Sequence, residues 1–176
     1  MPFTPFHLGF GVLLYALLSF LDPIALLLGT VIIDLEPAFY LLFGIGQLHG
    51  VLHSFFGVIV FTIPLSFISW VVSKLLLRFF RLDLRFRWHF SLLSSFLGLV
   101  SHILFDAGLY PEMMLLYPFT RRTGYLFGFW DNRLAMILLS VMFLLGVIIL
   151  AVKFLLKKIN KRVAAFPVPN EPDNFE

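Results

Sequence analysis

Residues 134–152 read LAMILLSVMFLLGVIILAV, a run of 19 residues without a charged side chain. A helix rises about 1.5 Å per residue, so this run would be about 28 Å long, against about 30 Å for the hydrocarbon core of a bilayer. The apolar pattern continues to Leu156 with one lysine in it. Residues 134–156 are therefore predicted to form a helix that crosses a membrane.

The composition of the whole chain fits the same environment. Of the 176 residues, 60% are apolar and 13% are charged, whereas an ordinary soluble domain is about 45–50% apolar and about 25% charged. Because a small fold keeps much of its surface in contact with solvent, these proportions exclude a soluble enzyme, a disordered chain and a nucleic-acid-binding domain. The basic residues form short clusters between apolar runs, so membrane lipids and not nucleic acid are the expected partners.

Further apolar stretches predict the remaining helices. Thr4-Pro5 and Asp22-Pro23 each pair an N-cap residue with a proline suited to the first helical position. A break is expected at Asp34-Leu35-Glu36-Pro37, because the residue before a proline resists the helical conformation. The expected helices are 5–21, 24–33, 50–77, 90–105 and 134–156. Residues 38–45 are expected to form a short re-entrant or interfacial turn of helix. The fold class is thus all-α, a polytopic integral membrane helix bundle of about five membrane helices, one short or re-entrant.

The chain divides into one membrane domain, residues 1–162, and a C-terminal tail, residues 163–176. The tail carries three of the ten acidic residues and three prolines, which indicates disorder. Lysine and arginine orient the domain: five lie between the third and fourth helices, five follow or end the fifth, and three lie between the fourth and fifth. Cytoplasmic loops carry the excess of basic residues, which predicts an outside N-terminus and a cytoplasmic C-terminus in a multi-pass cell-membrane protein.

Ionisable residues converge at the outer end of this arrangement. Seven of them fall at one predicted depth: His7, Asp34, Glu36, His49, His53, His102 and Asp106. His49 and His53 are four residues apart, as are His102 and Asp106, so a helix would present each pair on one face. Two ligands with this spacing can reach one metal ion, and histidine nitrogen with carboxylate oxygen suits zinc, manganese or iron. The sequence therefore predicts a metal site at the outer membrane–water interface.

Each of these groups also has a plain structural interpretation. His7 could anchor a helix end at the interface, and His102 with Asp106 could be a buried hydrogen-bonded pair that locks helices together. Asp34 and Glu36 could cap the turn that follows them. Ionisable groups at membrane depth are costly and usually functional, which favours the metal site over these alternatives.

Four segments resemble a known family. Ser101-His102-Ile103-Leu104-Phe105-Asp106 is similar to the S-H-I-L-x-D segment of the LexA-binding, inner-membrane-associated hydrolases, which are described as membrane-bound and metal-dependent. The opening residues 1–7, with their early histidine, resemble the start of those proteins and of archaeal relatives. Asp34-Leu35-Glu36-Pro37 resembles the family's D-x-D motif, and residues 49–54, HGVLHS, resemble its H-R-G-x-T-H-S motif. The resemblance covers roughly residues 1–118 and implies a metal-dependent membrane hydrolase.

This sequence departs from the family pattern at two of the segments. Glu36 occupies the second acidic place of the D-x-D motif, and no histidine follows it. The HGVLHS segment lacks the arginine, and its two histidines are one residue closer together. His53 is consequently the firmer match, and the role of His49 stays open.

The convergence and the resemblance together predict a metal-dependent hydrolase. One or two divalent ions, zinc or manganese, would be held by His7, Asp34, His53, His102 and Asp106. Glu36 or His49 would serve as the general base. The nearest positive charges on the outside are Arg121, Arg122 and Arg133. Guanidinium groups match phosphate oxygens, so these arginines would bind a phosphoester or lipid-type substrate.

Two other classes of protein stay open at this point. A small transporter or an ion or proton relay could use the same histidines and aspartates, although relays usually place such groups through the membrane depth. A non-enzymatic structural membrane protein could use them only to hold helices together. Interfacial arginines, in turn, commonly anchor lipid headgroups instead of binding substrate.

Overall fold

The structure is a computed structural model, and it describes residues 4–81, 87–120 and 131–163. All regular secondary structure in these ranges is helical, which confirms the all-α class. The elements, in chain order, are η1 (Thr4–Phe6), α1 (Leu8–Leu17), α2 (Pro23–Gly29), η2 (Ile32–Asp34), α3 (Leu35–Phe43), α4 (Phe55–Phe79), α5 (Trp88–Ala107) and α6 (Asn132–Val163), where η marks a 3-10 helix.

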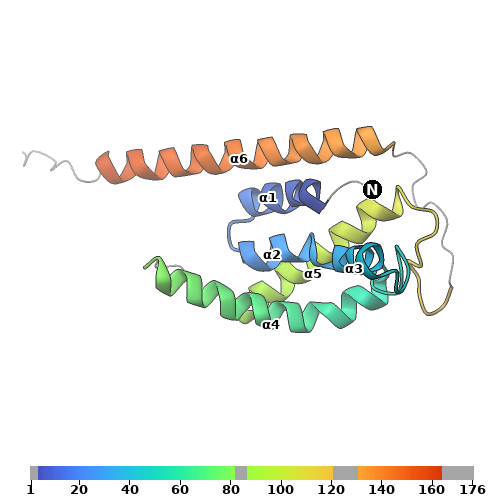
Figure 1. Cartoon of the computed structure of the whole chain (residues 1–176). Helices are drawn as coiled ribbons and strands as arrows, with labels where there is room; N and C mark the ends of the chain where they lie inside the picture. Colours follow the sequence, from blue (N-terminus) through green and yellow to red (C-terminus); the bar gives the residue numbers. More distant parts are fainter. Residues whose placement is uncertain (1–3, 82–86, 121–130, 164–176) are drawn as a thin grey trace, which may run out of the picture.

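Four helical segments are long and apolar enough to cross a membrane. They are Pro23–Phe43, Phe55–Phe79, Trp88–Ala107 and Asn132–Arg162, and the shorter helix Leu8–Leu17 is also apolar. Large apolar side chains cover the outer surface of this bundle, and Leu144 on α6 and Leu42 on α3 are 59% and 76% exposed. In Figure 1, α3 is seen end-on while α1, α2 and α6 run across the view, so the chain turns sharply after α2.

The helices pack in sequence across the bundle. α5 packs against both α2 and α4, while α1 packs against α2 on one side and α6 on the other. Figure 1 shows α6 along one edge with α1 beneath it and α4 at the opposite edge. The buried apolar core lies between α4 and α5 and includes Val58, Leu65, Leu99 and Ile103.

Glycines bring two of these helix pairs into backbone contact. A Cβ added at Gly98 of α5 would lie 2.5 Å from the carbonyl oxygen of Leu26 and 2.9 Å from the Cα of Gly29, both on α2. A Cβ at Gly146 of α6 would lie 2.7 Å from the backbone nitrogen of Leu13 on α1. Small residues at such crossings let membrane helices approach closely. The α2–α5 and α1–α6 pairs therefore pack backbone against backbone at these glycines.

A buried carboxylate ties three helices together at the end of the bundle away from α3. Asp22 is the N-cap of α2, as expected, and its side chain accepts bonds from the backbone nitrogens of Ile24 and Ala25. Ser73 of α4 and Ser91 of α5 donate their hydroxyls to the same carboxylate. Asp22 has no exposed surface, so these donors replace the water that the charge would otherwise need.

We expect Asp22→Ala to destabilise the bundle without removing its metal-binding capacity. The change deletes an N-cap and leaves two buried serine hydroxyls without their acceptor, which together cost roughly 2–4 kcal/mol. Thermal unfolding in detergent would measure the loss, with Asp131→Ala as the matched control, because Asp131 is exposed but also accepts a backbone bond at the start of its helix. Equal unfolding temperatures for the two variants would contradict a stabilising role for the buried serine bonds of Asp22.

Several predicted helix boundaries are wrong. The first helix divides into η1 and α1, and the second ends at Gly29, four residues early. The break expected at residues 34–37 lies earlier, between Gly29 and Ile32. Asp34 precedes α3, and Pro37 occupies the first turn of that helix, where a backbone N–H has no intrahelical partner. The helix expected from Gly50 begins at Phe55, because Ser54 accepts a bond from the backbone nitrogen of Gly57 and caps it.

The last two predicted helices are longer than expected. α5 starts two residues early and continues to Ala107, with the expected stop at Gly108 as its C-cap. α6 extends from Asn132 to Val163, seven residues past the predicted end, so the basic residues after Leu156 are helical. The predicted disordered tail, apart from Val163, lies outside the described residues.

Candidate metal centre

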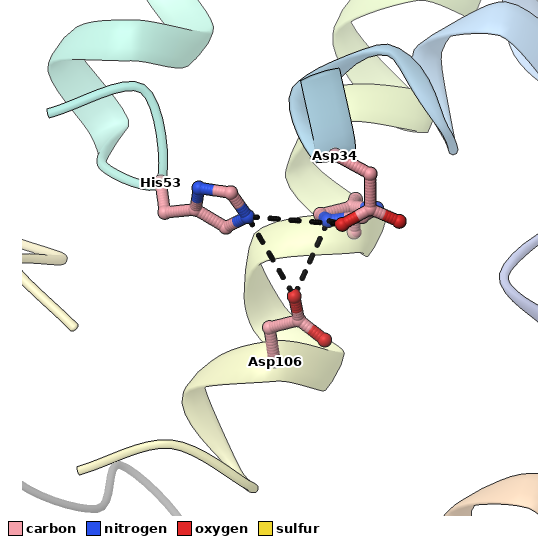
Figure 2. Close-up of side chains that lie close together, drawn as sticks. Asp34, His53 and Asp106 are labelled. Carbon is pink, nitrogen blue, oxygen red and sulfur yellow. Dashed lines mark ion pairs between the residues drawn. The ribbon is translucent and has the colours of Figure 1, made fainter. Parts of the chain in front are cut away.

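Four side chains from three parts of the chain meet at one end of the bundle. His102 and Asp106 lie one turn apart near the end of α5, Asp34 lies at the end of η2, and His53 lies in the turn before α4. One ligand atom from each of the four lies within 4.8 Å of all the others. Figure 2 shows Asp34, His53 and Asp106 pointing toward a common centre.

The spacing of the donor atoms fits a small divalent cation. His102 Nε2 lies 3.3 Å from both Asp34 Oδ1 and Asp106 Oδ2. His53 Nε2 lies 3.9 Å from Asp34 Oδ1 and 3.8 Å from Asp106 Oδ2. A tetrahedron with metal–ligand bonds of about 2.0–2.1 Å has edges of roughly 3.3–3.4 Å, so His102 already lies at this distance from both carboxylates, and His53 would have to approach them by about half an ångström.

The outer nitrogens of the two histidines are already occupied. His102 Nδ1 donates to the carbonyl oxygen of Thr30 at 2.8 Å, and His53 Nδ1 lies 2.8 Å from Glu36 Oε2. An acceptor at Nδ1 fixes the proton there and leaves the lone pair on Nε2. Among the described residues, both Nε2 atoms are buried and without a hydrogen-bond partner, so two bare imidazole nitrogens face the centre between the carboxylates.

The close crossing of α2 and α5 accounts for the position of His102. Gly29 and Gly98 meet at that crossing, and one turn beyond Gly98 the ring of His102 reaches the carbonyl oxygen of Thr30. The next turn of α5 carries Asp106 on the same face as His102, because residues four apart share a helix face. The predicted pairing of His102 with Asp106 on one helix is confirmed.

Glu36 lies behind His53 and not at the centre itself. Its carboxylate accepts bonds from the backbone nitrogens of Gly50 and Leu52 at 3.1 and 3.3 Å, besides the contact with His53. It therefore fixes the turn that carries His53 and orients the ring. This geometry favours a positioning role for Glu36 over the predicted role of general base.

Glu36→Gln is expected to weaken metal binding by about 10–100-fold, the usual cost of losing a carboxylate that orients a metal-ligating histidine. Titration of the metal-free protein with zinc by isothermal calorimetry would measure the change. Glu112→Gln is the matched control, because Glu112 contacts His49, which is not one of the four donors. Equal affinities for the two variants would exclude the positioning role.

His7 lies against the same centre but outside the group of four. Its Nε2 is 3.4 Å from Asp106 Oδ1, and its ring packs on that of His102 with centroids 4.3 Å apart. The side chain is buried, at 2% exposure. The structure thus brings His7 into contact with two of the four donors, at the entrance to α1.

His49 lies in the turn before α4, and the prediction that it shares a helix face with His53 is wrong. The two rings still meet edge to face, with centroids 5.1 Å apart. His49 Nδ1 lies 3.0 Å from Glu112 Oε1, and its ring stacks on Tyr110 at 4.1 Å. Glu112 and Tyr110 were missed by the sequence reasoning, although Glu112 is the only acidic residue between Asp106 and Asp131.

Burial and carboxylates shift the proton affinities of the side chains that border the spanning segments. Burial, and then the neighbouring His53, lower the pKa of His49. Burial alone would lower the pKa of His53, but the carboxylates of Asp34 and Glu36 raise it above its usual value. Burial and the charges of Asp106 and Asp34 raise the pKa of Tyr110. The centre therefore concentrates negative charge in a dry environment, which favours a divalent cation.

Of the three predicted substrate-binding arginines, the structure describes only Arg133. Arg121 and Arg122 lie outside the described residues. Arg133 is exposed in the first turn of α6, and its backbone nitrogen bonds to Asp131. A pocket of about 330 Å³ lies on the side of Glu36, and its lining includes Glu36, Gln47 and Tyr117 but none of the four donors.

Comparisons with protein-family models, curated proteins and solved structures find no match for this chain. The class of protein therefore comes from its fold and its site. The chain is a helical membrane bundle with a buried His/Asp group that could hold a metal ion.

Proposed function

We propose that this chain is an integral-membrane, metal-dependent hydrolase that acts on a phosphoester or lipid-type substrate at the outer membrane–water interface. The observation that carries the proposal is the meeting of two bare imidazole nitrogens with two carboxylates, inside 4.8 Å, at one end of a membrane bundle. A purely structural cluster would use those nitrogens in hydrogen bonds. Four possible ligands that converge on one point support binding of a cation.

The donor set supports zinc, with manganese as the alternative. Two imidazole nitrogens and two carboxylate oxygens are ligands that both ions accept, and the histidine nitrogens lie 3.3–3.9 Å from the carboxylate oxygens. A divalent ion held there, with a water as a further ligand, would lower the pKa of that water to about 7 and polarise the scissile group. Hydroxide would then be supplied at neutral pH.

His49 is the best-placed general base among the described residues. Glu112 holds its Nδ1, so the proton sits on that nitrogen and Nε2 can accept another. Tyr110 and His53 pack against the ring and fix its position. Glu112 thus orients His49 as Glu36 orients His53. This second carboxylate–histidine pair supports a role for His49 in acid–base catalysis beside the metal.

The surroundings of the centre support a substrate that comes from the membrane. α3 leaves the centre with exposed apolar side chains, among them Phe39 and Leu41, and the 330 Å³ pocket lies where α3 meets the turn that carries His53. A lipid-type phosphoester could place its chains along α3 and its headgroup in the pocket. Arg121, Arg122 and Arg133 stay proposed as its phosphate ligands.

The orientation is part of the proposal. The described basic residues of the α4–α5 connection and of the end of α6 lie at the end of the bundle opposite the His/Asp group (Figure 1). Because cytoplasmic ends carry more lysine and arginine, this supports an outward-facing centre with the N-terminus outside. We propose, together with this orientation, that the chain is related to the LexA-binding, inner-membrane-associated hydrolases that its motifs resemble.

Elemental mass spectrometry and a phosphoester assay together test the function. The full-length protein in detergent should contain about one or more equivalents of zinc or manganese and should hydrolyse a fluorogenic phosphatidic acid or a phosphodiester. Chelation should abolish turnover, zinc should restore it, and His49→Ala should slow it with the metal retained. His89→Ala is the control, since His89 lies at the first turn of α5 and far from the centre.

Three results would count against the proposal. Absence of metal even after reloading would overturn it entirely. Bound metal without turnover of any phosphoester would leave a metal protein of another kind. Metal-dependent flux in proteoliposomes without hydrolysis would favour the transporter.

A further inference from the structure

Beside the group of four donors, other buried polar atoms lack partners. His7 Nδ1, His7 Nε2 and Asp106 Oδ1 are all buried and make no hydrogen bond within the part of the chain that the structure describes. Such atoms are rare in folded proteins, because each loses its contact with water without compensation. Two of these three, His7 Nε2 and Asp106 Oδ1, face each other at 3.4 Å.

The two oxygens of Asp106 face different histidines. Oδ2 lies 3.3 Å from His102 Nε2 and 3.8 Å from His53 Nε2, inside the group of four. Oδ1 faces His7 on the other side of the carboxylate. The distance of 3.4 Å between Oδ1 and His7 Nε2 equals the edge expected between two ligands of one ion, roughly 3.3–3.4 Å.

The surrounding side chains hold His7 in this position. Its ring packs on His102 at 4.3 Å and meets Phe105 edge-on at 6.4 Å. The 3.4 Å contact between His7 Nε2 and Asp106 Oδ1 makes no hydrogen bond among the described residues. A second cation between these two atoms would use both of them as ligands.

We propose that the Asp106 carboxylate bridges two divalent cations, the second of them bound by His7 Nε2 and Asp106 Oδ1. This inference rests on the proposed function, which it deepens from one cation to a two-cation centre. Centres with ions about 3.5–4 Å apart are typical of phosphatases and nucleases as well as some peptidases. A second cation site therefore supports hydrolysis of phosphoesters as the proposed function.

Manganese is a probe that reports both the number of ions and their separation. Metal-free, full-length protein reloaded with Mn²⁺ should bind two equivalents and give the electron paramagnetic resonance spectrum of an exchange-coupled pair. His7→Phe, which keeps an aromatic ring against His102 and Phe105, should bind one equivalent and give the six-line spectrum of an isolated ion. His89→Phe should behave as the parent.

The outcomes separate this inference from the proposed function. One equivalent in the parent, unchanged in His7→Phe, would overturn the bridge and leave the four-donor site standing. Two equivalents without exchange coupling would also overturn the bridge. No binding of manganese or zinc would overturn both proposals. If His7→Phe fails to fold, His7→Gln takes its place, and the parent spectrum decides the bridge without any variant.

Discussion

Replacing His102 by alanine should abolish metal binding and, with it, hydrolysis. His102 Nε2 is the donor nearest to both carboxylates, at 3.3 Å from each. Loss of a direct ligand should cost more than the about 10–100-fold in affinity that loss of an outer partner costs. It should also leave Asp34 and Asp106 facing each other without a cation or a ring between them.

Elemental analysis and zinc titration of the purified variant would measure this effect. His102 is fully buried, so folding must be checked by circular dichroism and by gel filtration in detergent. Asp106→Asn provides a second variant of nearly unchanged shape, and it too should lose metal. A folded His102→Ala protein that retains stoichiometric zinc with parental affinity would show that the ion binds elsewhere.

Alanine at Gly98 should separate α2 from α5 and so damage both stability and metal affinity. The new Cβ would lie 2.5 Å from the carbonyl oxygen of Leu26 and 2.9 Å from the Cα of Gly29. These are backbone atoms, which cannot rotate away, so one helix must shift. Overpacking of this kind costs about 1–3 kcal/mol or more. The shift would also draw the Thr30 carbonyl away from His102 Nδ1.

Two measurements test this prediction together. Thermal unfolding should show the destabilisation, and zinc titration should show an affinity lower by about 10–100-fold, because an outer partner of His102 is lost. Gly11→Ala is the matched control, since the nearest atom to its new Cβ would be a side-chain methyl of Leu27 at 3.1 Å. Parental stability and affinity in Gly98→Ala would show that the crossing is not a constraint on the centre.

Local signals predicted those parts of the fold that depend on neighbours in sequence. Asp22-Pro23 marked the start of α2, and Gly108 marked the end of α5. The start of α4 was misplaced because Val51 and Leu52 continue the apolar pattern ahead of the helix, while the cap at Ser54 is a single hydrogen bond. The break at Pro37 was misplaced because a proline in the first turn of a helix removes no hydrogen bond.

The same distinction holds for the candidate centre. His102 and Asp106 were paired correctly because helical spacing is a local property. Glu112 and Tyr110 reach His49 through the shape of a loop, which no periodicity reveals. Ser73 and Ser91 are ordinary small residues in sequence, and only the packing of three helices shows that they share the carboxylate of Asp22.

The long contact of α6 with α1 has a consequence for biosynthesis. α6 packs mainly on α1 and η1, held by Gly9 and Gly146 at their crossing and by a bond from Lys153 Nζ to the Ala16 carbonyl oxygen. Asp34, His53, His102 and Asp106 all precede α6 in the chain, so the four-donor group can close before α6 leaves the ribosome. His7 lies where η1 meets α1, under the helix that is made last. We therefore expect the nascent protein to acquire its first cation early and to fix His7 only when α6 inserts beside α1.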